Sequence, residues 1–259
     1  MDASIIKKVR RAQPLIHHLT NQVVMNFTAN GLLAFGGSPI MAKAKEEAED
    51  IGKIVDGVLI NIGTVMPQDV QSMILAGKTA NERDIPVVFD PVGVKASSFR
   101  NEVAKEILQV VRPTIIKGNA SELAYLANIP WESKGVDSVG TGDVEEVAIK
   151  IAQIYETTVV LTGETDVICT GEELIHNMLG HELLTRMTGA GCLLGSIITA
   201  CLTTNDPTEL QAKTAVSFYG LAAQYAATRQ NVTGPGTFIP QFIDALSMEV
   251  EALRGGNYA

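Results

Sequence analysis

The sequence predicts an α/β fold in which helices cover a mostly parallel central sheet. Three runs rich in β-branched and other aliphatic residues, 57–61, 86–90 and 114–117, each end in a turn and are followed by a helical pattern. This repeated strand–turn–helix order is typical of a parallel sheet, because parallel neighbours need a crossover connection. Ligands gather at the carboxyl ends of such strands, so the residues there are the first candidates for a functional site.

Further strands are expected in the second half of the chain. Residues 157–162 form a short apolar run that fits the core of the sheet. Residues 167–170 and 174–177, joined across Gly171, have the pattern of a hairpin at the sheet edge.

Helical periodicity predicts the layers that cover this sheet. The expected helices span residues 21–35, 143–155, 193–202, 208–228 and 239–253. The first of them carries Asn21, Asn26 and Asn30 among apolar neighbours, and such polar groups need partners or a ligand. No internal repeat, low-complexity segment or Pro/Ser-rich linker divides the chain, so we expect a single domain over residues 1–259.

Composition restricts the class of partner. The chain has 259 residues, is 46% hydrophobic and carries a formal net charge of −9, with no basic patch that would offset it. Such a charge repels phosphate backbones, so we expect a small-molecule partner and no nucleic acid. No run approaches the roughly 20 apolar residues that span a bilayer, so we expect a soluble protein without a membrane partner.

The cysteines and histidines do not have the spacing of a structural zinc site. Cys169, Cys192 and Cys201 form no CxxC pair, and the four histidines form no HExxH motif. The number of cysteines is odd, and the first residues lack the apolar core of a signal peptide. Both observations favour a reducing, cytoplasmic location. His17 and His18 are expected to be structural or surface residues.

A glycine-rich turn at Thr188-Gly189-Ala190-Gly191-Cys192 directly precedes the apolar run 193–202. Backbone N–H groups of such a turn, with the positive end of the helix dipole, form a cavity for phosphate. The same dipole favours a thiolate, so the pKa of Cys192 is expected to lie below the free value of about 8.5, which makes it a candidate base or nucleophile. The alternatives are a tight turn beside a buried apolar cysteine, and a dinucleotide loop over residues 189–195, although such a loop normally follows the first strand of a chain.

Two carboxylates follow neighbouring predicted strands. Asp90 begins Asp90-Pro91-Val92-Gly93, and Glu122 ends Asn119-Ala120-Ser121-Glu122. At adjacent strand ends the pair could hold Mg²⁺ directly or through its waters. The alternative for Glu122 is a capping box with Asn119 at the start of a helix.

Two other turns are ambiguous. The segment 162–166 is either a simple strand-ending turn or a phosphate-binding loop that uses the Thr162 hydroxyl. The segment 140–143, Gly-Thr-Gly-Asp, superficially resembles an anion site with a carboxylate, but Asp143 followed by Glu146 favours an ordinary helix start.

Seven blocks of sequence resemble the hydroxyethylthiazole kinase family and keep its order between about residues 15 and 200. They are Leu19-Thr20-Asn21, Pro39-Ile40-Met41-Ala42, Asn61-Ile62-Gly63-Thr64, Asp90-Pro91-Val92-Gly93, Gly118-Asn119-Ala120-Ser121-Glu122, Leu161-Thr162-Gly163-Glu164-Thr165-Asp166 and Thr188-Gly189-Ala190-Gly191-Cys192. The resemblance implies a ribokinase-like three-layer fold. It also implies phosphorylation of the primary alcohol of 4-methyl-5-(2-hydroxyethyl)thiazole with ATP and Mg²⁺, in thiamine salvage.

The resemblance further assigns roles to individual residues. It implies a turn of Gly189, Ala190 and Gly191 with Cys192 at the position where most ribokinase-like enzymes carry an aspartate base. It also implies a homotrimer with active sites between subunits. The remaining roles it implies are substrate contacts at Met41 and Gly189, a thiazole pocket lined by Asn21 and Gly63, ATP contacts at Lys117 and Thr162, and a metal pair at Asp90 and Glu122.

The chain departs from the family pattern at two positions. Lys117 stands where the family often has arginine, which keeps the charge and loses the planar fork. Lys95 stands where a glycine is common. Three alternatives remain at this level: a ribokinase-like kinase for another small alcohol such as a hydroxymethylpyrimidine or a sugar, an NADP-dependent dehydrogenase, and a non-catalytic sensor of thiazole or nucleotide.

Overall fold

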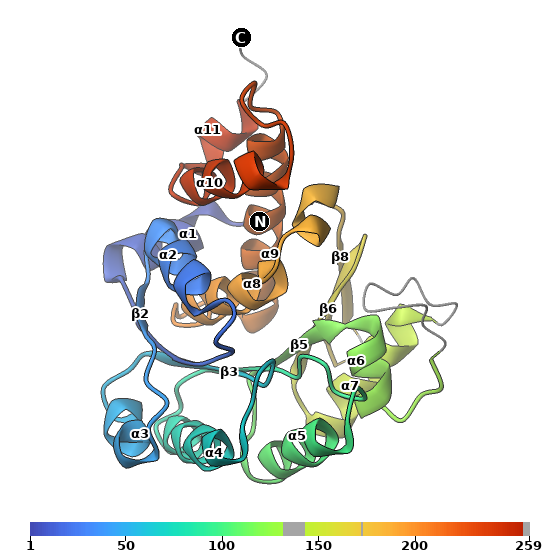
Figure 1. Ribbon diagram of the computed structural model, residues 1–259. Coiled ribbons are helices and arrows are strands. Elements are labelled where there is room, and N and C mark those ends of the chain that lie inside the picture. Colours follow the sequence, from blue (N-terminus) through green and yellow to red (C-terminus); the bar gives the residue numbers. More distant parts are fainter. Residues whose placement is uncertain (132–142, 172, 256–259) are drawn as a thin grey trace.

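The computed structural model describes residues 1–131, 143–171 and 173–255, and within them eight strands form one sheet in the order β2-β1-β3-β4-β5-β6-β7-β8 (Figure 1). Strands from β2 to β6 pair in parallel, and β7 and β8 are added antiparallel at one edge. The strands are β1 (Leu15–Leu19), β2 (Ser38–Ile40), β3 (Gly57–Asn61), β4 (Val87–Asp90), β5 (Ile115–Asn119), β6 (Thr158–Thr162), β7 (Asp166–Thr170) and β8 (Glu173–Asn177).

Helices cover both faces of the sheet (Figure 1). The helices are α1 (Ala3–Ala12), α2 (Met25–Phe35), α3 (Lys45–Gly52), α4 (Pro67–Glu82), α5 (Ser98–Val110), α6 (Ala120–Leu126), α7 (Val144–Tyr155), α8 (Ala190–Cys201), α9 (Thr208–Ala227), α10 (Pro235–Leu246) and α11 (Val250–Arg254), with a short 3₁₀ helix η1 (Glu182–Arg186) before α8. The expected three-layer α/β arrangement is confirmed.

Two apolar cores separate the three layers. Along β3, Leu59 faces the core made with α1, α2, α8, α9 and α10, whereas Val58 and Ile60 face the core made with α3 to α7. This alternation follows from the two-residue period of a strand, so a strand that is buried on both faces reads as a continuous apolar run. The central helix α8 is buried from Cys192 to Cys201, which explains its uniformly apolar sequence.

Most of the expected elements are confirmed with shifted ends. The hairpin is present as β7 and β8, with Gly171 at φ +64°. The first predicted helix begins at Met25 rather than residue 21, which leaves Asn21 in the turn after β1. The predicted helix 239–253 is two helices, α10 and α11, because α10 ends at Leu246 and the backbone is extended at Glu249, with φ −70° and ψ 150°, before α11 begins.

Strand β1 was not expected from the sequence, because two histidines interrupt its apolar pattern. Both are fully buried and bonded: His17 Nε2 contacts the Ala42 carbonyl at 2.8 Å, and His18 Nε2 contacts Ser196 Oγ at 2.7 Å. Their role is structural, and the alternative of a surface position is wrong.

Three further observations concern the sequence expectations. Asp143 caps α7 by accepting from the N–H groups of Glu145 and Glu146, as expected, while the glycine-bearing turn 140–142 lies outside the described residues. Cys169, Cys192 and Cys201 are buried free thiols. In the part of the chain that the structure describes, no helix has both the length and the apolar character that crossing a membrane requires.

Candidate active site

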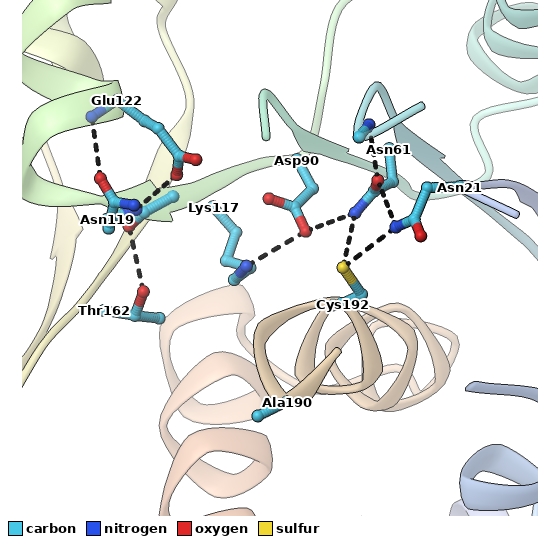
Figure 2. Close-up of polar contacts among 12 residues, drawn as sticks. Asn21, Asn61, Asp90, Lys117, Asn119, Glu122, Thr162, Ala190 and Cys192 are labelled. Carbon is cyan, nitrogen blue, oxygen red and sulfur yellow. Dashed lines mark hydrogen bonds and ion pairs between the residues drawn. The ribbon is translucent and has the colours of Figure 1, made fainter. Parts of the chain in front are cut away.

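The carboxyl ends of five parallel strands bring polar side chains to one edge of the sheet (Figure 2). Asn61 ends β3 and is the register partner of Asp90, which ends β4. Asn119 ends β5 and is the register partner of Thr162, which ends β6. Asn21 follows β1 by two residues. Residues far apart in sequence therefore meet because their strands are in register.

The glycine turn before α8 faces these strand ends. Gly189 adopts φ +91°, and a Cβ there would lie 2.5 Å from Val24 Cγ1, so the turn requires glycine at this position. Gly191 is exposed, and a Cβ on it would lie 3.2 Å from Lys117 Nζ. The first turn of α8 is thus open to solvent and lies beside a buried ammonium group, which suits an anion.

Tyr219 of α9 holds this turn from behind. Its hydroxyl donates to the Ala190 carbonyl at 2.7 Å, and the residue is 3% exposed. Burial, with a smaller contribution from Cys192, raises the pKa of Tyr219 well above its usual value, so the phenol remains a hydrogen-bond donor.

Cys192 is the residue for which the sequence expectation of a lowered pKa is wrong. Its Sγ accepts from two side-chain amides, Asn21 Nδ2 at 3.3 Å and Asn61 Nδ2 at 3.2 Å. Burial, and then the charge of Asp90, raise the pKa of the Cys192 thiol. Desolvation and a neighbouring carboxylate outweigh the helix dipole, so Cys192 is a protonated thiol.

Asp90 and Lys117 form a buried ion pair at the centre of the site. Lys117 Nζ lies 3.1 Å from Asp90 Oδ2, which also accepts from Asn61 Nδ2 at 2.8 Å. Burial alone would lower the pKa of Lys117, but the charge of Asp90, with a smaller contribution from Glu122, raises it, so the ammonium stays protonated. Among the described residues, the other Asp90 oxygen, Oδ1, is buried without a hydrogen-bond partner.

Glu122 forms the capping box that the sequence offered as its alternative role. Asn119 Oδ1 accepts from the Glu122 N–H, and Glu122 Oε2 accepts from the Asn119 N–H, each at 2.9 Å. Glu122 Oε1 also accepts from the Gly93 N–H at 2.9 Å, which ties α6 to the turn after Asp90. Burial and the charge of Asp90 raise the pKa of Glu122.

The remaining predicted residues divide into two groups. Gly63 lies against Asn21, since a Cβ on Gly63 would be 3.0 Å from Asn21 Nδ2, and the Thr162 hydroxyl donates to the Gly118 carbonyl at 3.3 Å. Met41 follows edge strand β2 and takes no part in the side-chain hydrogen bonds that join these groups in the described part of the chain. Hydrogen bonds and one ion pair thus join five of the predicted site residues through Asn61, namely Asn21, Gly63, Asp90, Lys117 and Cys192. Glu122 and Thr162 instead bond to backbone groups near the ends of β4 and β5.

Two residues of the site were missed as candidates from the sequence. Asn61 was noted only within a motif, although its position at the end of an apolar run is the signal that could have found it. Arg100 of α5 donates to the carbonyls of Gly63 and Val92 and joins the turns after β3 and β4. Nothing in the local sequence around Arg100 indicates this role.

Comparison with known proteins shows the family of the chain. A model of the hydroxyethylthiazole kinase family matches residues 6–251. The chain belongs to that family. It is 60% identical over 256 residues, 99% of this chain and 100% of the relative, to hydroxyethylthiazole kinase 1 of Oceanobacillus iheyensis.

Solved structures give the same family and fold. The hydroxyethylthiazole kinase of Pyrococcus horikoshii superposes with a TM-score of 0.87 at 36% identity, over 99% of this chain and 96% of that one. A ribokinase-like superfamily protein of Enterococcus faecalis superposes with a TM-score of 0.67 at 12% identity, over 99% and 95%, and shows the shared fold. A member of the hydroxyethylthiazole kinase family is a phosphotransferase, so the dehydrogenase and sensor alternatives are set aside.

Proposed function

We propose that this kinase transfers the terminal phosphoryl group of ATP to the hydroxyl of 4-methyl-5-(2-hydroxyethyl)thiazole, as a step of thiamine salvage. One observation carries the proposal: the open glycine turn at the start of α8 lies beside the Lys117 ammonium and adjoins the Asn21–Gly63 pair. The turn has the chemistry to hold phosphate, and the Asn21–Gly63 pair offers hydrogen-bonding groups to a small polar heterocycle.

The phosphate side works by electrostatic stabilisation. Backbone N–H groups of Gly189, Ala190 and Gly191, together with the positive end of α8, meet the charge of the moving phosphoryl group. Lys117 supplies a fixed positive charge beside this turn, and Thr162 at the end of β6 offers a hydroxyl to the nucleotide. Because phosphoryl transfer has a loose transition state, positioning and charge stabilisation outweigh the contribution of a base.

Cys192 contacts the substrate hydroxyl in this proposal. As a protonated thiol held by two amides, it orients the hydroxyl and is at most a mild base. Met41 contacts the thiazole from the edge of the sheet, beyond Asn21 and Gly63.

The acidic residues fit a magnesium ion. The unpartnered Asp90 Oδ1 is a free, buried acceptor of the hard-oxygen type that Mg²⁺ prefers. Glu122 uses both oxygens on backbone N–H groups, so we assign it a contact through water. No group of three His, Cys, Asp or Glu side chains suited to a metal occurs in the described ranges, and waters and phosphate oxygens would complete the coordination. The ion would neutralise phosphate charge.

The assembly and location of the enzyme are also proposed. A single sheet supports one domain over the chain, and the family resemblance supports a homotrimer with active sites between subunits. The free cysteines Cys169, Cys192 and Cys201 support a cytoplasmic location. Val23 is two residues from Asn21 in the sequence and is 69% exposed. Burial of this side chain in a contact between subunits would explain why an apolar residue occupies an exposed position. Light scattering after gel filtration tests the trimer, and a monomeric mass at assay concentration would reject it.

One assay tests the activity. ATP consumption is measured with the thiazole alcohol, a hydroxymethylpyrimidine and a panel of sugars, and the highest kcat/KM is expected for the thiazole. A higher kcat/KM for the pyrimidine or a sugar would reassign the substrate to another small alcohol. For the metal, Glu122→Gln should raise the Mg²⁺ concentration needed for half-maximal rate, and an unchanged titration would leave Glu122 as a cap alone.

A further inference from the structure

Asn61 makes four hydrogen bonds with its side-chain amide. Nδ2 donates to Asp90 Oδ2 at 2.8 Å and to Cys192 Sγ at 3.2 Å, and Oδ1 accepts from the Gly63 N–H at 3.0 Å and from Asn21 Nδ2 at 3.1 Å. The residue is 1% exposed. Both N–H donors and both lone pairs of the Asn61 amide are therefore used by neighbouring protein groups, which leaves no hydrogen bond for water.

The orientation of this amide follows from its partners. The N–H of Gly63 can only donate, so the oxygen of Asn61 faces it, and the nitrogen must face the Asp90 carboxylate. A flip of the amide would turn its nitrogen toward the Gly63 N–H and its oxygen toward the Asp90 carboxylate, which would set donor against donor and acceptor against acceptor. The partners consequently hold Asn61 in one rotamer, and Asn61 holds them in one arrangement (Figure 2).

These partners divide into two halves of the pocket. Asn21 and Gly63, on the oxygen side, belong to the thiazole-binding half, and Asp90 and Cys192, on the nitrogen side, belong to the phosphoryl-transfer half. We propose that Asn61 is a positioning residue that sets the distance between these two halves, and so places the substrate hydroxyl against Cys192 and the phosphate turn. The proposal deepens the proposed function and rests on it.

The register of the sheet explains why this position can do so. Asn61 and Asp90 are paired residues on β3 and β4, and Gly63 is two residues beyond Asn61 in the same chain. The short asparagine side chain can thus reach the neighbouring strand, its own turn and the first turn of α8 together. A glutamine would displace the amide by one methylene, and an apolar residue would leave several buried polar groups unpaired.

The substitution Asn61→Asp separates the two halves. It keeps an oxygen acceptor for Gly63 and Asn21, but it replaces the donor to Asp90 and Cys192 with a second carboxyl group, and two carboxyl groups this close share one proton. We expect KM for the thiazole to stay within about threefold, while kcat falls roughly 10- to 100-fold, the size of a lost hydrogen bond to a charged group. Asn61→Ala removes both sides, so it should raise KM and lower kcat.

A matched control is available at Asn81, which bonds the backbone of Arg112 on both sides of its amide and lies at the end of α4, outside the pocket. Asn81→Asp makes the same chemical change and should leave kcat and KM as in the parent. Melting temperatures of all variants are measured beside the kinetics. The proposal would be overturned if Asn61→Asp raised KM and lowered kcat by the same factors as Asn61→Ala. Asn61 would then be a structural residue only.

A second measurement does not depend on activity. The rate of Cys192 alkylation by iodoacetamide is followed by mass spectrometry of its peptide, which separates it from Cys169 and Cys201. Loss of the Asn61 donor should slow alkylation in Asn61→Asp at least about fivefold, since the thiolate loses a stabilising N–H. Asn21→Ala, which removes only the second donor, should slow it less. Parent-like alkylation in Asn61→Asp would overturn the link to Cys192 even if the thiazole proved not to be the substrate, so the two failures are distinguishable.

Discussion

The Lys117 ammonium and the Asp90 carboxylate lie 3.1 Å apart with side chains that are 5% and 0% exposed. Because neither charged group is solvated by water, the stability of each buried charge depends on the presence of the other. The pair joins the end of β4 to β5 directly beneath the glycine turn of α8, and it places a positive charge where the proposed nucleotide phosphates enter.

Removal of one member of this pair should destabilise the protein. Lys117→Met leaves Asp90 buried without its counter-charge, and we expect a loss of about 3 to 5 kcal/mol in the free energy of unfolding. Adding Asp90→Asn to Lys117→Met should recover part of that loss while the activity stays absent. Urea unfolding of the single and double variants measures the coupling. Equal stability of Lys117→Met and the parent would mean that the pair contributes nothing to folding.

Alanine at the two glycines of the turn should have different effects. Gly189→Ala forces a Cβ at φ +91° to within 2.5 Å of Val24, so we expect lower stability and almost no turnover. Gly191→Ala meets only the flexible end of Lys117, at 3.2 Å. It should fold normally and raise KM for ATP. Melting temperature and ATP kinetics separate the cases, and a stable, fully active Gly189→Ala variant would contradict the phosphate-binding role of the turn.

Cys192→Asp should retain or increase turnover. The amides of Asn21 and Asn61 that donate to Sγ can donate equally to a carboxylate, which is a base at neutral pH, whereas the thiol is protonated. Cys192→Ala should lower kcat by only about tenfold, because it removes a group that orients the hydroxyl and a base contributes little to a loose transition state. If both variants were inactive, a covalent role of the cysteine would have to replace the one proposed here.

Stability should fall in mild acid because of His18. Burial lowers the pKa of His18 from 6.5 to about 4 in the folded protein. Below pH 6.5 the unfolded chain therefore binds a proton at His18 that the folded chain does not bind. The free energy of unfolding should consequently decrease by about 3 kcal/mol between pH 6.5 and pH 4. Above pH 7 the residue contributes no pH dependence.

The slope of stability against pH is the measurement that checks this effect. Urea unfolding at several pH values should give a flatter slope for His18→Asn than for the parent. An unchanged slope in His18→Asn would assign the acid sensitivity to other groups.

Lys95 occupies a left-handed backbone conformation that a glycine would adopt without strain. Its φ is +81°, and its ammonium donates to the Trp131 carbonyl at 3.2 Å. Lys95→Gly and Lys95→Ala both lose that bond, but only alanine keeps the Cβ. The glycine variant should therefore be more stable by about 1 kcal/mol, measured by urea unfolding. An alanine variant of equal or greater stability would show that the turn is unstrained.

Local sequence predicted those parts of the site that local structure creates. The glycine turn before α8 was expected, and the Asn119–Glu122 capping box was one of the two alternatives for Glu122, because each depends on the backbone of neighbouring residues. Strand β1 was missed, because buried histidines are rare and the partners that satisfy His17 and His18, Ala42 and Ser196, are distant in sequence.

The amino-acid sequence by itself determined the parallel α/β fold, the glycine turn before α8 and the family, since these follow from periodicity, glycine positions and ordered motifs. Only the tertiary structure decided that Lys117 is paired with Asp90, that burial raises the pKa of Cys192 and that Asn61 bonds Asp90 and Cys192 as well as Gly63. The physical reason is that charge and hydrogen bonding depend on burial and on neighbours, and here those neighbours come from strands and helices that are brought together by the register of the sheet.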